Sequence, residues 1–231
     1  MEPLIQEEIP SSYLPESACL KKEILGPDPI PEAGMEEAWT RAYDQFRSLS
    51  CPRIIYRALS QDEFTSAFLT PIADPEATPL FDILSRVQEL FLFCGTVGKE
   101  PGESADRWFQ EGDFLSGYLL DRLAAFGAEQ LSRYLERKLQ QKYMTVFLAY
   151  SPGYCGWPVE HQEQLFGMLH PEKIGVHLSE SFVMHPMKSV SGALVGGSSR
   201  THIFPLHYVC CQTCTTRTCL DRMREIRMRN E

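Results

Sequence analysis

The sequence predicts an α+β fold in which a mixed or antiparallel twisted sheet is flanked by helices. Two long segments, 35–49 and 113–142, repeat apolar side chains at the three- and four-residue spacing of a helical face. Short apolar or alternating runs before, between and after them have the length of strands. Because helices and strands do not alternate strictly along the chain, their order favours α+β over a parallel α/β sheet.

Four helices are expected. The first, Met35–Leu49, ends before Cys51-Pro52, because the residue that precedes a proline disfavours helical backbone. The longest, Asp113–Lys142, carries a leucine-rich stripe that Gly127 interrupts only mildly, and we expect it to pack on the sheet as a central helix. Shorter helices are expected at Leu80–Leu90 and Pro158–Leu169.

Five strands are expected from their composition and length. They are Arg53–Leu59, Leu90–Val97, Thr145–Tyr150, and approximately Val176–Met184 and Ser189–Val195. The first alternates apolar and charged residues, as a half-buried strand does, whereas the second is a continuous apolar run typical of a buried strand. Residues 185–188 join the last two.

Composition divides the chain into three parts. Residues 1–35 are rich in proline and carboxylates, so we expect an extended arm that lies on the body or is partly mobile. Residues 36–208 contain most of the expected elements and form one α+β body. Residues 209–231 form a tail rich in cysteine and arginine.

Charge and hydropathy exclude several classes of protein. The net charge of −9 argues against non-specific binding to nucleic acid, which depends on lysine and arginine at phosphates. The longest apolar runs are far shorter than the roughly 20 residues that cross a bilayer. The first ten residues contain three glutamates and no basic residue, unlike a signal or transit peptide. We therefore expect a cytoplasmic protein that binds neither nucleic acid nor membrane.

Motifs of conventional catalysis are missing from the sequence. Cys94–Lys99 places glycines and a lysine after an apolar run, but it fails the spacing of a phosphate-binding loop, and Glu100 takes the place of the required hydroxyl. We interpret this segment as the turn at the end of a strand. The six histidines are scattered, and there is no nucleophile elbow and no carboxylate pair specific to a hydrolase.

Four of the eight cysteines lie within ten residues near the C-terminus. They are Cys210, Cys211, Cys214 and Cys219. The C-x2-C-x4-C spacing brings several thiolates close enough to bind one metal, and it suits either an iron–sulfur cluster or zinc. Adjacent cysteines do not easily bind the same ion, so the fourth ligand stays open between Cys210, Cys155, His207 and an external group.

About fifty residues carry a more specific pattern. It reads Ser151-Pro152-Gly153-Tyr154, then Leu178-Ser179-Glu180-Ser181-Phe182-Val183-Met184-His185-Pro186, then Ser189-Val190-Ser191-Gly192. This pattern resembles the signature of the activation domain of vitamin B12-dependent methionine synthase, approximately R-P-A-x-G-Y-P followed by L-T-E-S-x-x-M-x-P-x-x-S-V-S-G. The second half matches in order and spacing with few changes.

The resemblance implies a curved α+β fold whose concave face binds S-adenosylmethionine and docks over a cobalamin carried by a corrinoid protein or B12-dependent methyltransferase. In that family, inactive cob(II)alamin is reduced by one electron and remethylated from S-adenosylmethionine. The expected function is therefore reductive reactivation of such a methyltransferase, as an accessory to that enzyme. The resemblance assigns seven residues to cofactor binding: Glu129, Tyr154, Glu180, Ser181, Met184, Ser189 and Ser191.

Two features differ from the fused family domain. The family's arginine, which would pair with the carboxylate of S-adenosylmethionine, falls at Ala149. The cysteine-rich tail resembles the tails of free-standing relatives from anaerobic organisms, and an iron–sulfur cluster there would supply the electron directly. The alternative is a non-enzymatic module that binds a corrinoid protein, with structural zinc or no metal in its tail. The pattern at 178–192 argues against an unrelated zinc-tail protein.

Overall fold

The computed structural model describes residues 4–26, 34–72, 74–204 and 208–212. At its centre is a five-stranded sheet in which all neighbouring strands are antiparallel. In spatial order, the strands are β1 (Ile5–Glu8), β2 (Arg53–Ala58), β3 (Glu89–Thr96), β7 (Ser189–Gly197) and β4 (Val146–Tyr150). The predicted α+β class with an antiparallel sheet is confirmed.

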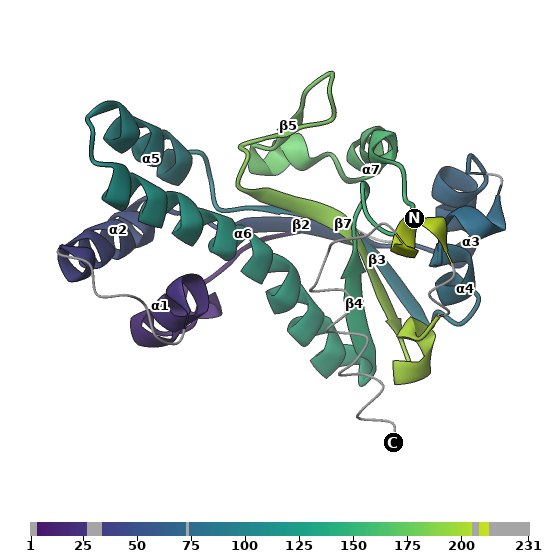
Figure 1. Cartoon of the computed structure of the whole chain (residues 1–231). Coiled ribbons are helices and arrows are strands. Elements are labelled where there is room, and N and C mark those ends of the chain that lie inside the picture. Colours follow the sequence, from purple (N-terminus) through teal and green to yellow (C-terminus); the bar gives the residue numbers. More distant parts are fainter. Residues whose placement is uncertain (1–3, 27–33, 73, 205–207, 213–231) are drawn as a thin grey trace.

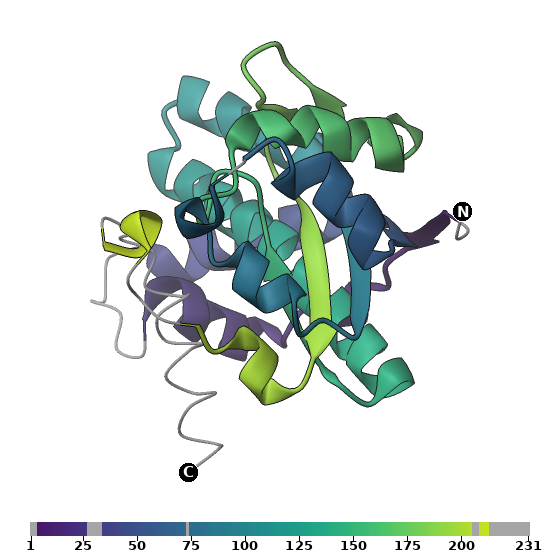
Figure 2. The ribbon, with the colours of Figure 1, turned by 90° about the vertical axis from the view of Figure 1, so that its right-hand side faces the viewer.

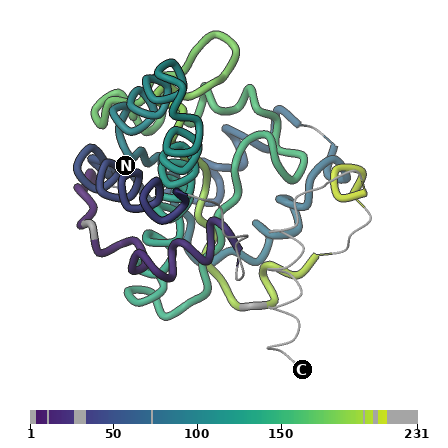
Figure 3. The backbone as a smooth tube through the Cα atoms, turned by 60° about the vertical axis from the view of Figure 1, so that its left-hand side comes forward, coloured from purple at the N-terminus to yellow at the C-terminus, as the bar shows by residue number. Residues whose placement is uncertain are grey.

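Helices cover both faces of the sheet (Figure 1). The first face packs against α6 (Phe114–Tyr143), and α1 (Ser17–Leu25), α2 (Met35–Leu49) and α5 (Glu100–Gln110) pack on α6 in the same core. The second packs against α3 (Gln61–Phe64), α4 (Leu80–Leu84) and α7 (Gln162–Leu169), which lie in front of the sheet in Figure 2. Figure 3 shows the four helices of the first group gathered on one side of the molecule.

Alternate side chains of β3 enter two different cores. Phe91 and Phe93 pack on the side of α2 and α6, whereas Leu92 and Cys94 pack on the side of α4 and α7. Because both faces of this strand are buried, its sequence is a continuous apolar run and does not alternate. The same burial raises the pKa of the Cys94 thiol above its ordinary value.

The central helix is α6, which has 30 residues. It begins after Asp113, whose carboxylate accepts the backbone N–H of Ser116 at 3.2 Å. Gly127 serves packing within this helix, because a β-carbon there would lie 2.8 Å from the ring of Phe46 on α2. The glycine thus lets the two helices approach closely. No helix in the described ranges, α6 included, is both long and apolar enough to span a bilayer.

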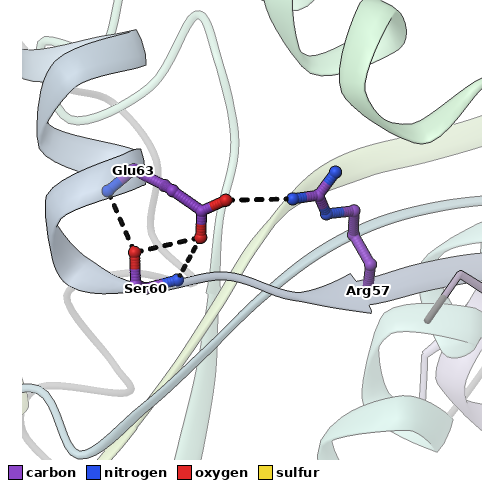
Figure 4. Close-up of polar contacts among 3 residues, drawn as sticks. All are labelled: Arg57, Ser60 and Glu63. Carbon is purple, nitrogen blue, oxygen red and sulfur yellow. Dashed lines mark hydrogen bonds and ion pairs between the residues drawn. The ribbon is translucent and has the colours of Figure 1, made fainter. Parts of the chain in front are cut away.

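A capping box starts α3 and ties it to the end of β2 (Figure 4). Ser60 Oγ accepts the N–H of Glu63 at 3.1 Å, and one carboxylate oxygen of Glu63 accepts the N–H of Ser60 at 2.9 Å. The other oxygen pairs with the nearly buried Arg57 at 3.4 Å. The hydrogen bonds from Ser60, and to a lesser degree the charge of Arg57, hold the pKa of Glu63 below its ordinary value.

The predicted strand Val176–Met184 is wrong. These residues instead form a hairpin of two short strands, β5 (His177–Leu178) and β6 (Met184–His185). Its turn is closed at Ser179, whose N–H donates to the carbonyl of Val183 at 2.9 Å and whose Oγ accepts the N–H of Val183 at 3.1 Å. The serine hydroxyl competes with strand pairing and favours the turn, which the alternating pattern did not reveal.

Other segments also differ from expectation. The predicted helix at Leu80–Leu90 ends at Leu84, because β3 begins at Glu89. Pro158–Leu169 divides into a 3-10 turn, Val159–His161, followed by α7. The helix α5 was not predicted.

The N-terminal segment has more regular structure than an extended arm. Its strand β1 pairs with β2, and α1 buries Leu20 completely in the first core. The prolines at 10 and 15 lie between these two elements, which agrees with their tendency to interrupt regular structure. The division of the chain into arm (1–35), body (36–208) and tail (209–231) stays a prediction.

We expect Gly192→Ala to destabilise the fold, because a β-carbon at this position of β7 would lie 2.2 Å from the carbonyl oxygen of Tyr150 on β4. The free energy of unfolding, measured by urea denaturation, should fall by about 1–3 kcal/mol. Gly167→Ala is the matched control, since nothing lies within 4 Å of its added carbon. That control should raise stability by about 0.5–1 kcal/mol, as alanine favours helix. Equal stability of the two variants would contradict the close approach.

Candidate functional site

The residues of the sequence pattern gather around the first half of β7. The pairing of β4 with β7 runs from Val146 opposite Gly197 to Tyr150 opposite Ala193. Beyond that point β7 continues to Ser189, and among the described residues it is paired there only with β3, on its other side. The chain that leaves β4 therefore passes the unpaired edge of β7 as a loop, residues 151–157.

This loop is held by tight turns and by a buried tryptophan. The N–H of Gly153 donates to the carbonyl of Trp157 at 2.7 Å, and the N–H of Trp157 donates to the carbonyl of Tyr154 at 2.9 Å. Trp157 is 1% exposed and contacts the rings of Phe64 and Phe68. Tyr154, in contrast, is 57% exposed. The loop thus presents the tyrosine of the pattern to solvent from a rigid base.

A second anchor joins the loop to the segment before α4. Thr78 Oγ1 donates to the carbonyl of Cys155 at 2.6 Å, and a β-carbon at Gly156 would lie 2.1 Å from the carbonyl oxygen of Ala77. Cys155 adopts a left-handed backbone conformation, with φ of 54°. This conformation is unusual for a residue other than glycine, and these contacts hold it in place.

On α6, the carboxylate that reaches β4 is Glu136, which the sequence did not single out. Its Oε1 accepts the N–H of Ala149 at 2.9 Å, at the position where the family pattern has arginine. Glu129 lies two turns earlier and is exposed to solvent. The signal that could have found Glu136 is the seven-residue spacing between the two, which puts both on one side of the helix.

The hairpin β5–β6 carries three of the predicted site residues. Glu180 and Ser181 lie in its exposed turn, where the hydroxyls of Ser179 and Ser181 are 3.0 Å apart. Met184 pairs with Leu178 at the start of β6 and packs against the second core. The turn projects from the body in Figure 1.

The two serines of β7 do not reach a common surface with the hairpin turn. Ser189 Oγ donates to the carbonyl of Pro186 at 2.7 Å. Ser191 is only 4% exposed, and it shares a strand face with Ala193 and Val195, which belong to the second core. Across the residues that the structure describes, no hydrogen bond or ion pair joins Glu129, Tyr154 and Glu180.

The first two cysteines of the C-terminal run lie in α8 (Val209–Gln212), half-buried against the second core. Beside them, Tyr208 donates a hydrogen bond to Asp82 at 2.7 Å, and burial together with this carboxylate raises the pKa of Tyr208 to about 12. α8 contacts the short helix Pro75–Ala77, whose last residue touches the loop 151–157 at Gly156. The start of the cysteine run therefore lies near the loop that carries Tyr154.

The predicted metal site is only partly visible. Cys214 and Cys219 lie outside the described residues, and so does His207. Among residues 4–26, 34–72, 74–204 and 208–212, no group of three or more histidine, cysteine, aspartate or glutamate side chains is placed to hold a metal ion. Cys210 and Cys211 alone would need further ligands.

The family follows from a direct comparison. The model of the family described as "Vitamin B12 dependent methionine synthase, activation domain" matches residues 89–210, just over half of the chain. This chain belongs to that family. The match begins at β3 and ends in α8, so it includes α6, the loop 151–157, the hairpin β5–β6 and β7.

A solved structure extends the likeness beyond the matched residues. The chain is similar to the crystal structure of the MetH reactivation domain bound to AdoHcy, with a TM-score of 0.57 and 15% sequence identity. The alignment covers 85% of this chain and 79% of that one. This likeness shows the fold of an activation domain. No curated protein matches the chain in sequence.

Close to the tyrosine loop, His161 generates a pH-dependent prediction. It is 8% exposed, its Nδ1 is buried without a hydrogen-bond partner in the described structure, and burial lowers its pKa below the ordinary 6.5. The unfolded chain therefore binds a proton before the folded one does, so the free energy of unfolding should fall as the pH drops below about 6.5. Denaturation curves between pH 7.5 and 5.5 measure this slope.

We expect His161→Gln to flatten that slope, whatever it does to stability at pH 7.5. His177→Gln is the control, because His177 is exposed in the hairpin. An unchanged slope in His161→Gln would show that another group causes the acid sensitivity.

Proposed function

We propose that this chain reactivates a corrinoid-dependent methyltransferase, such as methionine synthase, by docking over its cobalamin during one-electron reduction and remethylation from S-adenosylmethionine. The observation that carries the proposal is the loop 151–157, in which the buried Trp157 fixes an exposed Tyr154 beside the unpaired edge of β7. An exposed aromatic ring on a rigid base suits contact with a large, flat macrocycle. Membership of the activation-domain family supports this function.

The other predicted site residues would have two kinds of role, contact with the partner and positioning of the chain. Glu180 and Ser181, in the exposed turn of the hairpin, would contact the corrinoid partner, while Met184 holds the hairpin on the body. Ser189 and Ser191 would act by position: the first fixes the chain at Pro186, and the second packs within the core.

Binding of S-adenosylmethionine would rely on a reduced set of groups. The solved neighbour contains AdoHcy, the demethylated form of this methyl donor, and its fold is that of our chain. Here Ala149 offers only its backbone, and its N–H is already bonded to Glu136. The exposed Glu129 is the carboxylate that would pair with the ligand's ammonium group. We therefore propose weaker anchoring of the ligand's carboxylate than an arginine would give.

The cysteine run would hold the electron-donating group. Cys210, Cys211, Cys214 and Cys219 are the proposed ligands of an iron–sulfur cluster, which when bound supplies one electron at a time. The placement of Cys210 and Cys211 near the tyrosine loop supports this assignment, since electron transfer to the corrinoid requires proximity. We further propose that the protein works in the cytoplasm, where thiolates are kept reduced.

The second candidate is a non-enzymatic module that binds a corrinoid protein, with structural zinc or without metal. It is favoured by Ala149, because the chain has no cation at that position for the carboxylate of S-adenosylmethionine. The two candidates differ in metal content, so one measurement separates them.

If the cluster is present, protein purified without oxygen should be brown, absorb at about 400 nm and contain bound iron and sulfide. Cys214→Ser should lose most of this iron. Cys19→Ser is the control, because Cys19 lies exposed on α1, far along the chain from the run, and its iron content should stay at the wild-type level. A colourless wild-type protein with stoichiometric zinc, or with no metal, would support the binding module.

Tyr154→Ala should slow reactivation by about tenfold or more, because a stacking contact contributes about 1–3 kcal/mol. The assay follows conversion of cob(II)alamin to methylcobalamin on a cobalamin-dependent methionine synthase, with an external reductant and S-adenosylmethionine. Tyr118→Ala is matched in exposure, at 51%, but lies near the start of α6. If both variants reactivate at the wild-type rate, the loop does not contact the corrinoid.

A further inference from the structure

A cavity of about 730 Å³ lies apart from the tyrosine loop. It is bounded by the first residue of β2 (Arg53), the last residue of β3 (Thr96), the first turn of α5, and the base of the hairpin β5–β6. Its volume falls within the range of small-molecule sites. Neither Glu129 nor Tyr154 lines it.

Ion pairs within the wall neutralise some of the charges. Lys188 pairs with Asp121 at 2.7 Å, and Lys99 pairs with Glu103 at 3.2 Å. Three charged side chains of the lining have no such partner in the described structure: Arg53, Glu100 and Asp106. One guanidinium and two carboxylates therefore face the same space with their charges uncompensated.

Arg53 is the least solvated of the three, because it is only partly exposed while Glu100 and Asp106 are open to solvent. Its Nε is buried and makes no hydrogen bond within the described residues. A β-carbon at Gly175 would lie 3.6 Å from its Nη2, so the backbone there packs against the guanidinium without blocking it. A buried donor without an acceptor costs stability unless a ligand or water accepts from it.

The first turn of α5 adds to the field at Arg53. No side chain caps this helix, and its N-terminal residues Lys99, Glu100 and Gly102 line the cavity. Backbone N–H groups at a helix start favour an anion. On another side, Ile174, Pro186 and Met187 supply an apolar wall.

We propose that this cavity binds a free α-amino acid with an apolar side chain. The ligand's carboxylate would bind Arg53, its ammonium group would bind between Glu100 and Asp106, and its side chain would pack against Ile174 and Met187. Fork-shaped pairing of guanidinium with carboxylate is the strongest contact available here. A phosphate would meet four carboxylates in the lining, and a metal would find no group of three ligands among the described residues.

The cavity is also distant from Ala149, the position beside which the proposed function places the carboxylate of S-adenosylmethionine. Arg53 is opposite Thr96, which is opposite Ser189, whereas Ala149 is opposite Leu194. Five residues along β7 correspond to about 16 Å. One carboxylate could not be bound at both places, so variants distinguish them.

Isothermal titration of the full chain with L-methionine tests the proposal, with N-acetyl-L-methionine and L-methionine methyl ester as probes that lack one charge each. We expect binding of L-methionine alone, and a loss of affinity of about tenfold or more in Arg53→Gln. If Arg53→Gln fails to fold, Asp106→Asn replaces it, because Asp106 is exposed and its substitution should leave the fold intact. Asp106→Asn should also lower the affinity for L-methionine. Glu129→Gln should bind like the wild type.

Three results would overturn the proposal. They are no binding of L-methionine at millimolar concentration, equal binding of the acetylated or esterified probe, and loss of binding in Glu129→Gln with none in Arg53→Gln. The last would place the amino acid on the α6 surface. None of these readouts depends on corrinoid reactivation, so failure here and failure of the proposed function are distinguishable.

Discussion

Burial of β3 and β7 on both faces is the constraint on which the rest of the structure depends. Phe93 and Leu194 point to one core, and Leu92 and Val195 to the other, so neither strand has a solvent-facing side. Helices must then cover both faces, because each apolar face needs a partner layer. The helix α6 lies on the first face across β3, β7 and β4, and the shorter helices α3, α4 and α7 cover the second.

The same constraint places the loop 151–157. Since β4 pairs with only part of β7, the chain leaves the sheet at Tyr150, while β7 continues to Ser189. Trp157 returns the loop to the second core, so Tyr154 between them points outward. Glu136 fixes the end of β4 from the other face. Contacts on both faces of the sheet therefore fix the backbone on either side of the exposed Tyr154.

Elements with a clear periodicity of apolar residues could be predicted from the sequence. Elements that depend on single contacts could not. α2 was predicted to the residue, and α6, β2, β3 and β7 nearly so, because each buries a long apolar face. The hairpin at 177–185 depends on the Ser179 hydroxyl, and β1 is too short to show a period. The pattern also supplied the candidate site residues, but the inward direction of Ser191 depends on strand register, which sequence does not give.

At 15% identity, a shared fold does not imply shared ligands. The ligands of this chain depend on the groups that it presents for binding. At Ala149 this chain lacks the cation that would bind an amino-acid carboxylate, and at Arg53 it has a guanidinium without a counter-ion in the described structure. The sheet separates the two positions by several residues of β7. The proposed corrinoid-facing surface at Tyr154 and the proposed amino-acid cavity at Arg53 are therefore compatible within one fold, because β3 and β7 lie between β2, which carries Arg53, and β4, which leads into the tyrosine loop.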